Sequence, residues 1–150
     1  MVNSETLRRL LIASLAAVRW ELEAGTYCLE HDTSFWEASG FTFTDDDAER
    51  RRLFVAGKEA LVDQIVTALR SLPFNATVFD TGRYTVLLAE AIDSVQFELD
   101  TKTLADDLLI AIDGCYGEGG REKNERRIAE YEGLIAQIHH VTGHGERLHA

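Results

Sequence analysis

The sequence predicts an α+β domain in which two N-terminal helices, a three-stranded antiparallel meander and two C-terminal helices follow one another. Apolar residues recur at helical spacing over residues 4–23 and 44–72, as is typical of amphipathic helices. Residues 75–100 are instead rich in Val, Thr, Tyr and Phe, with turn-like pairs between them, which is typical of strands. Helical spacing returns after residue 103. A mainly helical bundle with a short β-ribbon is the alternative fold.

The first helix is expected over residues 4–23. Ser4 is a suitable N-cap, and Gly25 is a suitable stop because glycine is favoured just beyond a helix end. A buried face is predicted from the spacing of Leu7, Leu10, Leu11, Leu15, Val18 and Leu22.

The second helix is expected to begin at Thr44 and to end before Pro73, the only proline. Thr44 and Asp47 are three positions apart, which resembles a capping box with Asp in place of the usual Glu. A long connection over residues 26–44 separates the two helices, and connections of this length are often functional. It carries four large aromatic side chains: Phe35, Trp36, Phe41 and Phe43.

The meander is expected from three strands at residues 75–80, 83–91 and 94–100. Thr81-Gly82 and Ile92-Asp93 would form the two hairpin turns. The third strand shows an alternation that places Glu98 and Asp100 on its solvent face. Its predicted inward residues are Val95, Phe97 and Leu99.

The third helix is expected to start at Thr103, where a Thr-x-x-Asp cap recurs. Glycines between residues 114 and 120 then interrupt the chain. The last helix is expected over residues 121–142, with Gly143 ending it.

The length of 150 residues fits a single domain over residues 1–150. No apolar run approaches the roughly 18 residues of a membrane span, and the first residues lack the features of a signal peptide. We therefore expect a cytoplasmic protein that does not bind membranes. The two cysteines, Cys28 and Cys115, are interpreted as buried thiols on that basis.

Charge is unevenly distributed along the chain, whose net charge is −11. Residues 21–49 contain nine carboxylates and neither Lys nor Arg, so this block alone sums to −9. Residues 74–120 contain nine carboxylates against Arg83 and Lys102, which sums to −7. Such a field argues against direct binding to nucleic acid, whose phosphates would be repelled, and favours a basic protein surface. Acidity that only keeps the protein soluble is the alternative.

This charge map leads to the hypothesis of a non-enzymatic acidic module that engages a basic surface of a larger target. The target can itself bind nucleic acid, because carboxylates can then stand in for phosphates. Toxin-neutralising immunity proteins and phage anti-defence proteins that inhibit host nucleases are analogous in charge and size. The predicted interface residues are Glu30, Asp32, Trp36, Glu37, Asp45, Asp46, Asp47, Glu98 and Asp100. No metal or cofactor is expected.

Two other classes of function stay open. Asp80-Thr81-Gly82 matches the catalytic tripeptide of aspartic proteases, although a hairpin turn explains it better. Four histidines near the C-terminus raise the possibility of a metal-dependent hydrolase, although a strong zinc site needs three or four ligands. These are His139, His140, His144 and His149. A self-associating structural subunit is the third class, and the sequence decides neither between these classes nor between monomer and homodimer.

Overall fold

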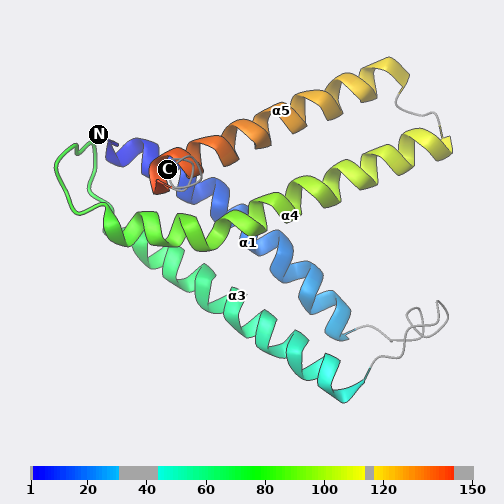
Figure 1. Ribbon diagram of the computed structural model, residues 1–150, viewed down its shortest axis with the longest axis horizontal. Helices are drawn as coiled ribbons and strands as arrows, with labels where there is room; N and C mark the ends of the chain where they lie inside the picture. Colours follow the sequence, from blue (N-terminus) through cyan, green and yellow to red (C-terminus); the bar gives the residue numbers. More distant parts are fainter. Residues whose placement is uncertain (1, 31–43, 114–116, 144–150) are drawn as a thin grey trace.

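The protein, seen in a computed structural model, is described over residues 2–30, 44–113 and 117–143. Four long helices follow one another: α1 (Ser4–Glu30), α3 (Asp45–Ser71), α4 (Gly82–Asp113) and α5 (Gly117–Thr142) (Figure 1). The described part of the chain contains no strand. The predicted α+β fold with its three-stranded meander is therefore wrong, and the molecule is a helical bundle.

The second and third predicted strands lie inside α4. Its buried apolar residues are spaced by three or four positions, as on one face of a helix. The predicted hairpin turn at Ile92-Asp93 is continuous helix. The Val, Thr and Tyr content of this segment favours strands, but its buried apolar side chains stand at helical spacing, and their packing in the core overrides propensity. The buried set is Tyr84, Leu88, Ala91, Val95 and Leu99.

The Asp80-Thr81-Gly82 tripeptide begins α4 instead of closing a hairpin. The Thr81 carbonyl accepts hydrogen bonds from the backbone N–H groups of Tyr84 (3.1 Å) and Thr85 (3.0 Å). The Asp80 carboxylate accepts one from the N–H of Gly82 at 3.0 Å. These bonds satisfy amides that have no partner within the first turn of the helix.

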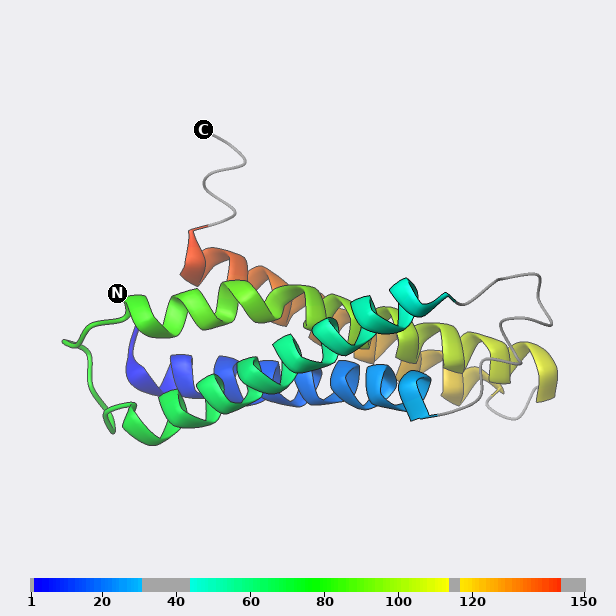
Figure 2. The ribbon, with the colours of Figure 1, turned by 90° about the horizontal axis from the view of Figure 1, so that it is seen from below.

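Residues 72–81, which include the first predicted strand, form the loop between α3 and α4. The N-terminus of α1 anchors this loop: the Ser4 N–H donates to the carbonyl of Ala76, and the Ala76 N–H donates to Ser4 Oγ, both at 2.8 Å. Arg8 donates to the carbonyls of Leu69, Leu72 and Pro73 at 3.3–3.5 Å. The loop and the first turn of α1 accordingly lie at the same end of the molecule (Figure 2).

Several helix boundaries also differ from expectation. Asn3, not Ser4, caps α1, because its side chain accepts from the Thr6 N–H at 2.8 Å. Helix α1 continues past Gly25 to Glu30. At Gly25 a Cβ would lie 3.2 Å from a methyl carbon of Val55, so this glycine permits the close approach of α3. No helix begins at Thr103, which lies within α4.

Other local predictions are confirmed. Thr44 and Asp47 form the expected capping box at the start of α3. Leu72 is the C-cap of that helix, directly before Pro73. Gly143 follows α5 with φ of 74°, a left-handed conformation that glycine adopts readily.

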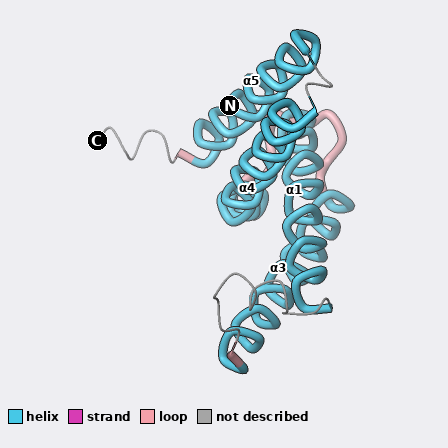
Figure 3. Tube along the Cα trace, turned by 90° about the vertical axis from the view of Figure 1, so that its right-hand side faces the viewer, coloured by secondary structure: helices cyan, strands magenta, loops and turns pink. Residues whose placement is uncertain are grey.

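The helices are layered in the order α3, α1, α4, α5 (Figure 3). Helix α1 packs on both α3 and α4, and α5 packs on α4. Helices α3 and α4 touch only sparsely, since they diverge from the loop at residues 72–81 (Figure 1). The core joins all four helices, with Leu11, Ile65, Leu88 and Ile138 among its fully buried side chains. None of the described helices combines the length and apolarity that a membrane span requires.

Candidate functional site

The predicted acidic cluster at Asp45, Asp46 and Asp47 forms the first turn of α3. Asp47 accepts hydrogen bonds from the Thr44 N–H (3.0 Å) and the Thr44 hydroxyl (2.8 Å). These bonds, with a smaller contribution from the charge of Arg50, lower the pKa of Asp47. Carboxylates are also favoured at this end of a helix by its dipole. Helix capping therefore accounts for this cluster without a partner.

Arginines of the next turn further reduce the local charge. Arg50 lies 3.3 Å from Asp47, and Arg52 lies 3.3 Å from Glu49. Both pairs are exposed, so each contributes little to stability. The −9 block predicted from the sequence is thus balanced in part by the residues that follow it.

Glu98 does not lie on a solvent-facing strand, because its side chain is buried where α4 meets α5. It accepts hydrogen bonds from Lys102, at 2.7 Å, and from the hydroxyl of Tyr131 on α5. Burial would lower the pKa of Lys102, but hydrogen bonding to Glu98 and the charge of Glu98 outweigh it, so this pKa is raised. Burial and the hydrogen bond to Glu98 also raise the pKa of Tyr131.

Trp20 of α1 completes this cluster. The Lys102 ammonium lies 4.7 Å from the centre of the Trp20 ring, a favourable cation–π distance. The indole N–H of Trp20 donates to the hydroxyl of Thr101 at 2.9 Å. Glu98 and Lys102 thus join α1, α4 and α5, and their role is structural.

Asp100 is exposed, as predicted, and accepts a hydrogen bond from Gln96 at 2.9 Å. Glu30 is the last residue of α1, and its side chain lies outside the described part of the structure. Asp32, Trp36 and Glu37 also lie outside the described residues, as do Phe35, Phe41, Phe43, His144 and His149. Of the nine predicted interface residues, the described part of the structure thus shows Asp45, Asp46 and Asp47 in the first turn of α3, Glu98 buried and Asp100 exposed.

The two enzymatic alternatives find no assembled site among the described residues. The Asp80 carboxylate accepts a hydrogen bond from the N–H of Gly82, the first residue of α4. His139 and His140 lie in the last turn of α5, and no group of three metal-ligating side chains occurs in the described ranges.

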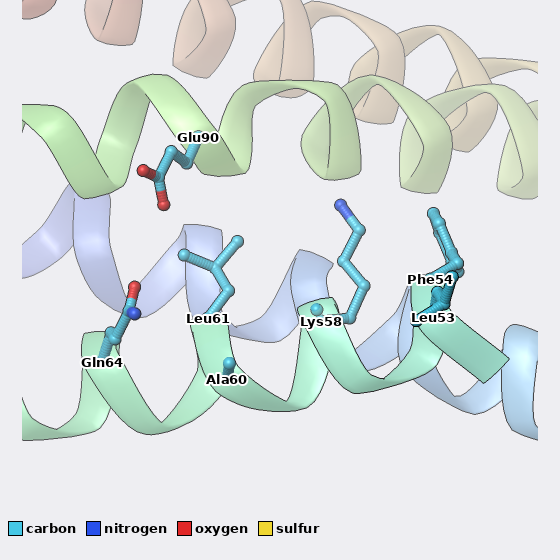
Figure 4. A pocket seen from close by; sticks show the side chains of 8 residues that line it. Leu53, Phe54, Lys58, Ala60, Leu61, Gln64 and Glu90 are labelled. Atoms are coloured by element: carbon cyan, nitrogen blue, oxygen red, sulfur yellow. The ribbon is translucent and has the colours of Figure 1, made fainter. Parts of the chain in front are cut away.

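A groove between α3 and α4 is a concave feature of the described surface. One hollow of about 440 Å³ has Leu53, Phe54, Lys58, Leu61 and Glu90 among its lining residues. Figure 4 shows Phe54, Lys58 and Leu61 of α3 pointing towards α4, and Glu90 of α4 pointing back towards them. Leu53 and Phe54 are 64% and 40% exposed, which leaves large apolar side chains open to solvent.

A second hollow, of about 350 Å³, continues the groove towards the loop at residues 72–81. It is lined by Asp63, Gln64, Thr67, Ala68, Arg83 and Leu87. Gln64 lines both hollows, so they are neighbours between α3 and α4. We call the whole feature the α3–α4 groove.

A buried ion pair lies beside the α3–α4 groove, because Lys58, which lines the groove, pairs with Glu21. The Lys58 ammonium lies 2.7 Å from the carboxylate of Glu21 on α1 and donates to Ser94 Oγ of α4 at 2.8 Å. Ser94 in turn donates to Glu21 at 3.2 Å. The side chains of Lys58 and Glu21 are only 15% and 11% exposed. Lys58 therefore links three helices, and its charge is already neutralised inside the protein.

The sequence contains a signal for this groove that its charge pattern obscures. Five residues of α3 at alternating spacings of four and three are uncharged, yet all five are exposed. A surface helix normally places charged residues on its exposed face. An uncharged stripe beside the buried stripe predicts a second packing surface. The stripe consists of Leu53, Gly57, Ala60, Gln64 and Thr67.

Comparison with known proteins adds no assignment: no family model, no curated protein and no solved structure matches this chain.

Proposed function

We propose that the protein is a non-enzymatic binding module that engages a basic surface of a protein partner through the α3–α4 groove. The observation that carries the proposal is the exposed, uncharged stripe of α3 that faces this groove. Apolar surface gathered in one concave place is typical of interaction sites.

The net charge of −11 supports a basic partner. Helix α4 presents exposed carboxylates along the side of the groove and beyond it, at Glu90, Asp93 and Asp100. Negative charge around an apolar contact steers a cationic partner and disfavours acidic competitors. The contact surface proposed here thus differs from the acidic cluster at Asp45–Asp47, which capping explains.

Capture of partners from the source cells, at moderate salt, tests this function when two variants are compared with the wild type. At both Gly57, in the groove, and Gly133, on α5, a Cβ would meet nothing within 4 Å. Gly57→Gln therefore fills the groove, whereas Gly133→Gln makes the same change on another helix. We expect a partner that the wild type and Gly133→Gln retain and that Gly57→Gln loses, with retention decreasing as salt rises. A partner retained equally by both variants would exclude the α3–α4 groove as the binding surface.

A further inference from the structure

We propose that the α3–α4 groove receives one amphipathic α-helix of a partner protein, with a Lys or Arg placed against Glu90. This inference rests on the proposed function and specifies the partner that the same surface recognises. The groove supplies three arguments, from its length, its surface chemistry and its unpaired charge.

The length of the groove suits a helix. The uncharged stripe runs from Leu53 to Thr67 along a continuous helix. At 1.5 Å per residue this distance is about 21 Å, the length of a helix of about 15 residues. The two hollows share Gln64 as a lining residue, so they lie next to each other, and a helix of this length would cover both.

The surface chemistry of the groove matches that of a helix–helix seam. Spacings of four and three are those of the core positions in packed helices. Gly57 and Ala60 occupy the middle of the stripe, where their small side chains allow another helix to approach closely. Leu53 and Phe54, near the start of α3, offer a larger exposed apolar contact. Apolar anchors in grooves of this kind are how amphipathic helices are recognised.

The charges at the groove define the complementary charge of the ligand. The Lys58 ammonium is neutralised by the Glu21 carboxylate at 2.7 Å, so it does not favour an anionic group on the ligand. Glu90 on α4 and Asp63 on α3 form no ion pair with any residue in the described ranges. A cation on the incoming helix would pair with these carboxylates, whereas Arg83, in the second hollow, would favour a polar or acidic residue.

The same charges favour a different protein over a second copy of this chain. A second copy would bring a further net charge of −11, and high net charge opposes self-association. The expected ligand therefore has a large apolar residue near Leu53, small residues across Gly57 and Ala60, and a cation opposite Glu90.

Model peptides test the inference directly. Four fluorescent 18-residue helices would carry one Leu/Ala face with flanking Lys, each peptide in a different register, and a Glu-flanked peptide would serve as the charge control. Fluorescence anisotropy at two salt concentrations would measure their affinity for the wild type and for four variants. Gly57→Gln and Glu90→Gln change the groove. Gly133→Gln and Glu132→Gln are their matched controls, because both residues are exposed on α5.

At least one Lys-flanked peptide should bind the wild type and both controls with similar affinity. Gly57→Gln should weaken that binding by about thirtyfold, a loss typical of a central contact. Glu90→Gln should weaken it by about threefold, as expected for a partly exposed ion pair, and the effect should shrink at high salt. The Glu-flanked peptide should bind least. Circular dichroism would verify that every variant is folded.

Three outcomes would overturn the helical ligand. If no register binds the wild type more tightly than it binds Gly57→Gln, the protein attracts the peptides through its overall charge alone. If sedimentation reveals a dimer that Gly57→Gln dissociates, a second copy fills the groove. A partner whose capture depends on Gly57 while all four peptides fail would leave the proposed function standing, and only the helical ligand would be wrong.

Discussion

Helix α4 meets α1 and α3 in two different ways. Towards α1 it packs closely, and its buried side chains, which include Leu88, Ala91 and Val95, belong to the common core. Towards α3 it borders the open groove, where large apolar side chains of α3 remain exposed. The closed seam between α1 and α4 buries apolar surface and so stabilises the fold. The open groove between α3 and α4 leaves apolar surface available for a partner. The contrast separates the part of the bundle that holds the fold from the part that we propose binds.

The ion pair between Glu21 and Lys58 lies where the closed seam meets the groove, and its loss should have the largest effect. Glu21→Ala leaves the buried Lys58 ammonium without a carboxylate and should destabilise the protein by about 3–5 kcal/mol. Urea unfolding would measure this change. Glu23→Ala, at an exposed site on the same helix, should stay within about 0.5 kcal/mol. Equal effects of the two substitutions would mean that Glu21 does not hold the three helices together.

The first turns of α3 lie beyond the closed seam, because the first buried side chain of this helix is Val55. Its start therefore depends on the capping box, and Thr44→Ala should cost about 1 kcal/mol. We expect faster amide hydrogen exchange over residues 45–52 and unchanged exchange in α4. Exchange that rises equally in both helices would contradict a local role.

The capping box also gives this helix start a pH dependence. The folded state lowers the pKa of Asp47 below its ordinary value of 3.8, so the stabilisation is present above that value. It is lost as the pH falls through the lower, folded pKa. The difference between the wild type and Asp47→Asn should therefore be constant near neutral pH and disappear in acid. A difference that persists below the folded pKa would exclude the carboxylate as its source.

The sequence predicts the parts of this fold that depend on local chemistry. Thr44 and Asp47 form the capping box, and Pro73 follows the C-cap of α3, because each of these features needs only residues close in the chain. The prediction of strands between Tyr84 and Leu99 is wrong because it follows the Val, Thr and Tyr content of these residues, which favours strands. Their spacing of three and four favours a helix, and tertiary packing on α1 decided the outcome.

The candidate site was harder to predict, because a groove exists only once α3 and α4 diverge. The charge pattern predicts an interface at the carboxylates of residues 21–49. Of these, Asp47 caps α3 and Glu21 forms a buried ion pair. The informative signal was the absence of charge from Leu53 to Thr67 on an exposed side of α3. Exposure cannot be known from that pattern alone, since the same spacing would also fit a second buried face.

Two glycines compare the closed and open sides of α3 directly, although the expected effects are small. Gly25 of α1 lies against the closed side, and Gly57 of α3 lies on the open side. At Gly57 a Cβ would meet nothing within 4 Å, so Gly57→Ala should raise the free energy of unfolding by about 0.5–1 kcal/mol, because alanine favours the helix. At Gly25 a Cβ would lie 3.2 Å from Val55 and 3.6 Å from Phe54, so crowding should cancel or reverse that gain in Gly25→Ala. Urea unfolding of both variants, with Gly133→Ala as a further open site, would measure the difference. If Gly57→Ala destabilised the protein while Gly133→Ala stabilised it, α3 would pack on α4 in solution. The α3–α4 groove would then be closed, and the surface on which we base binding would not be accessible.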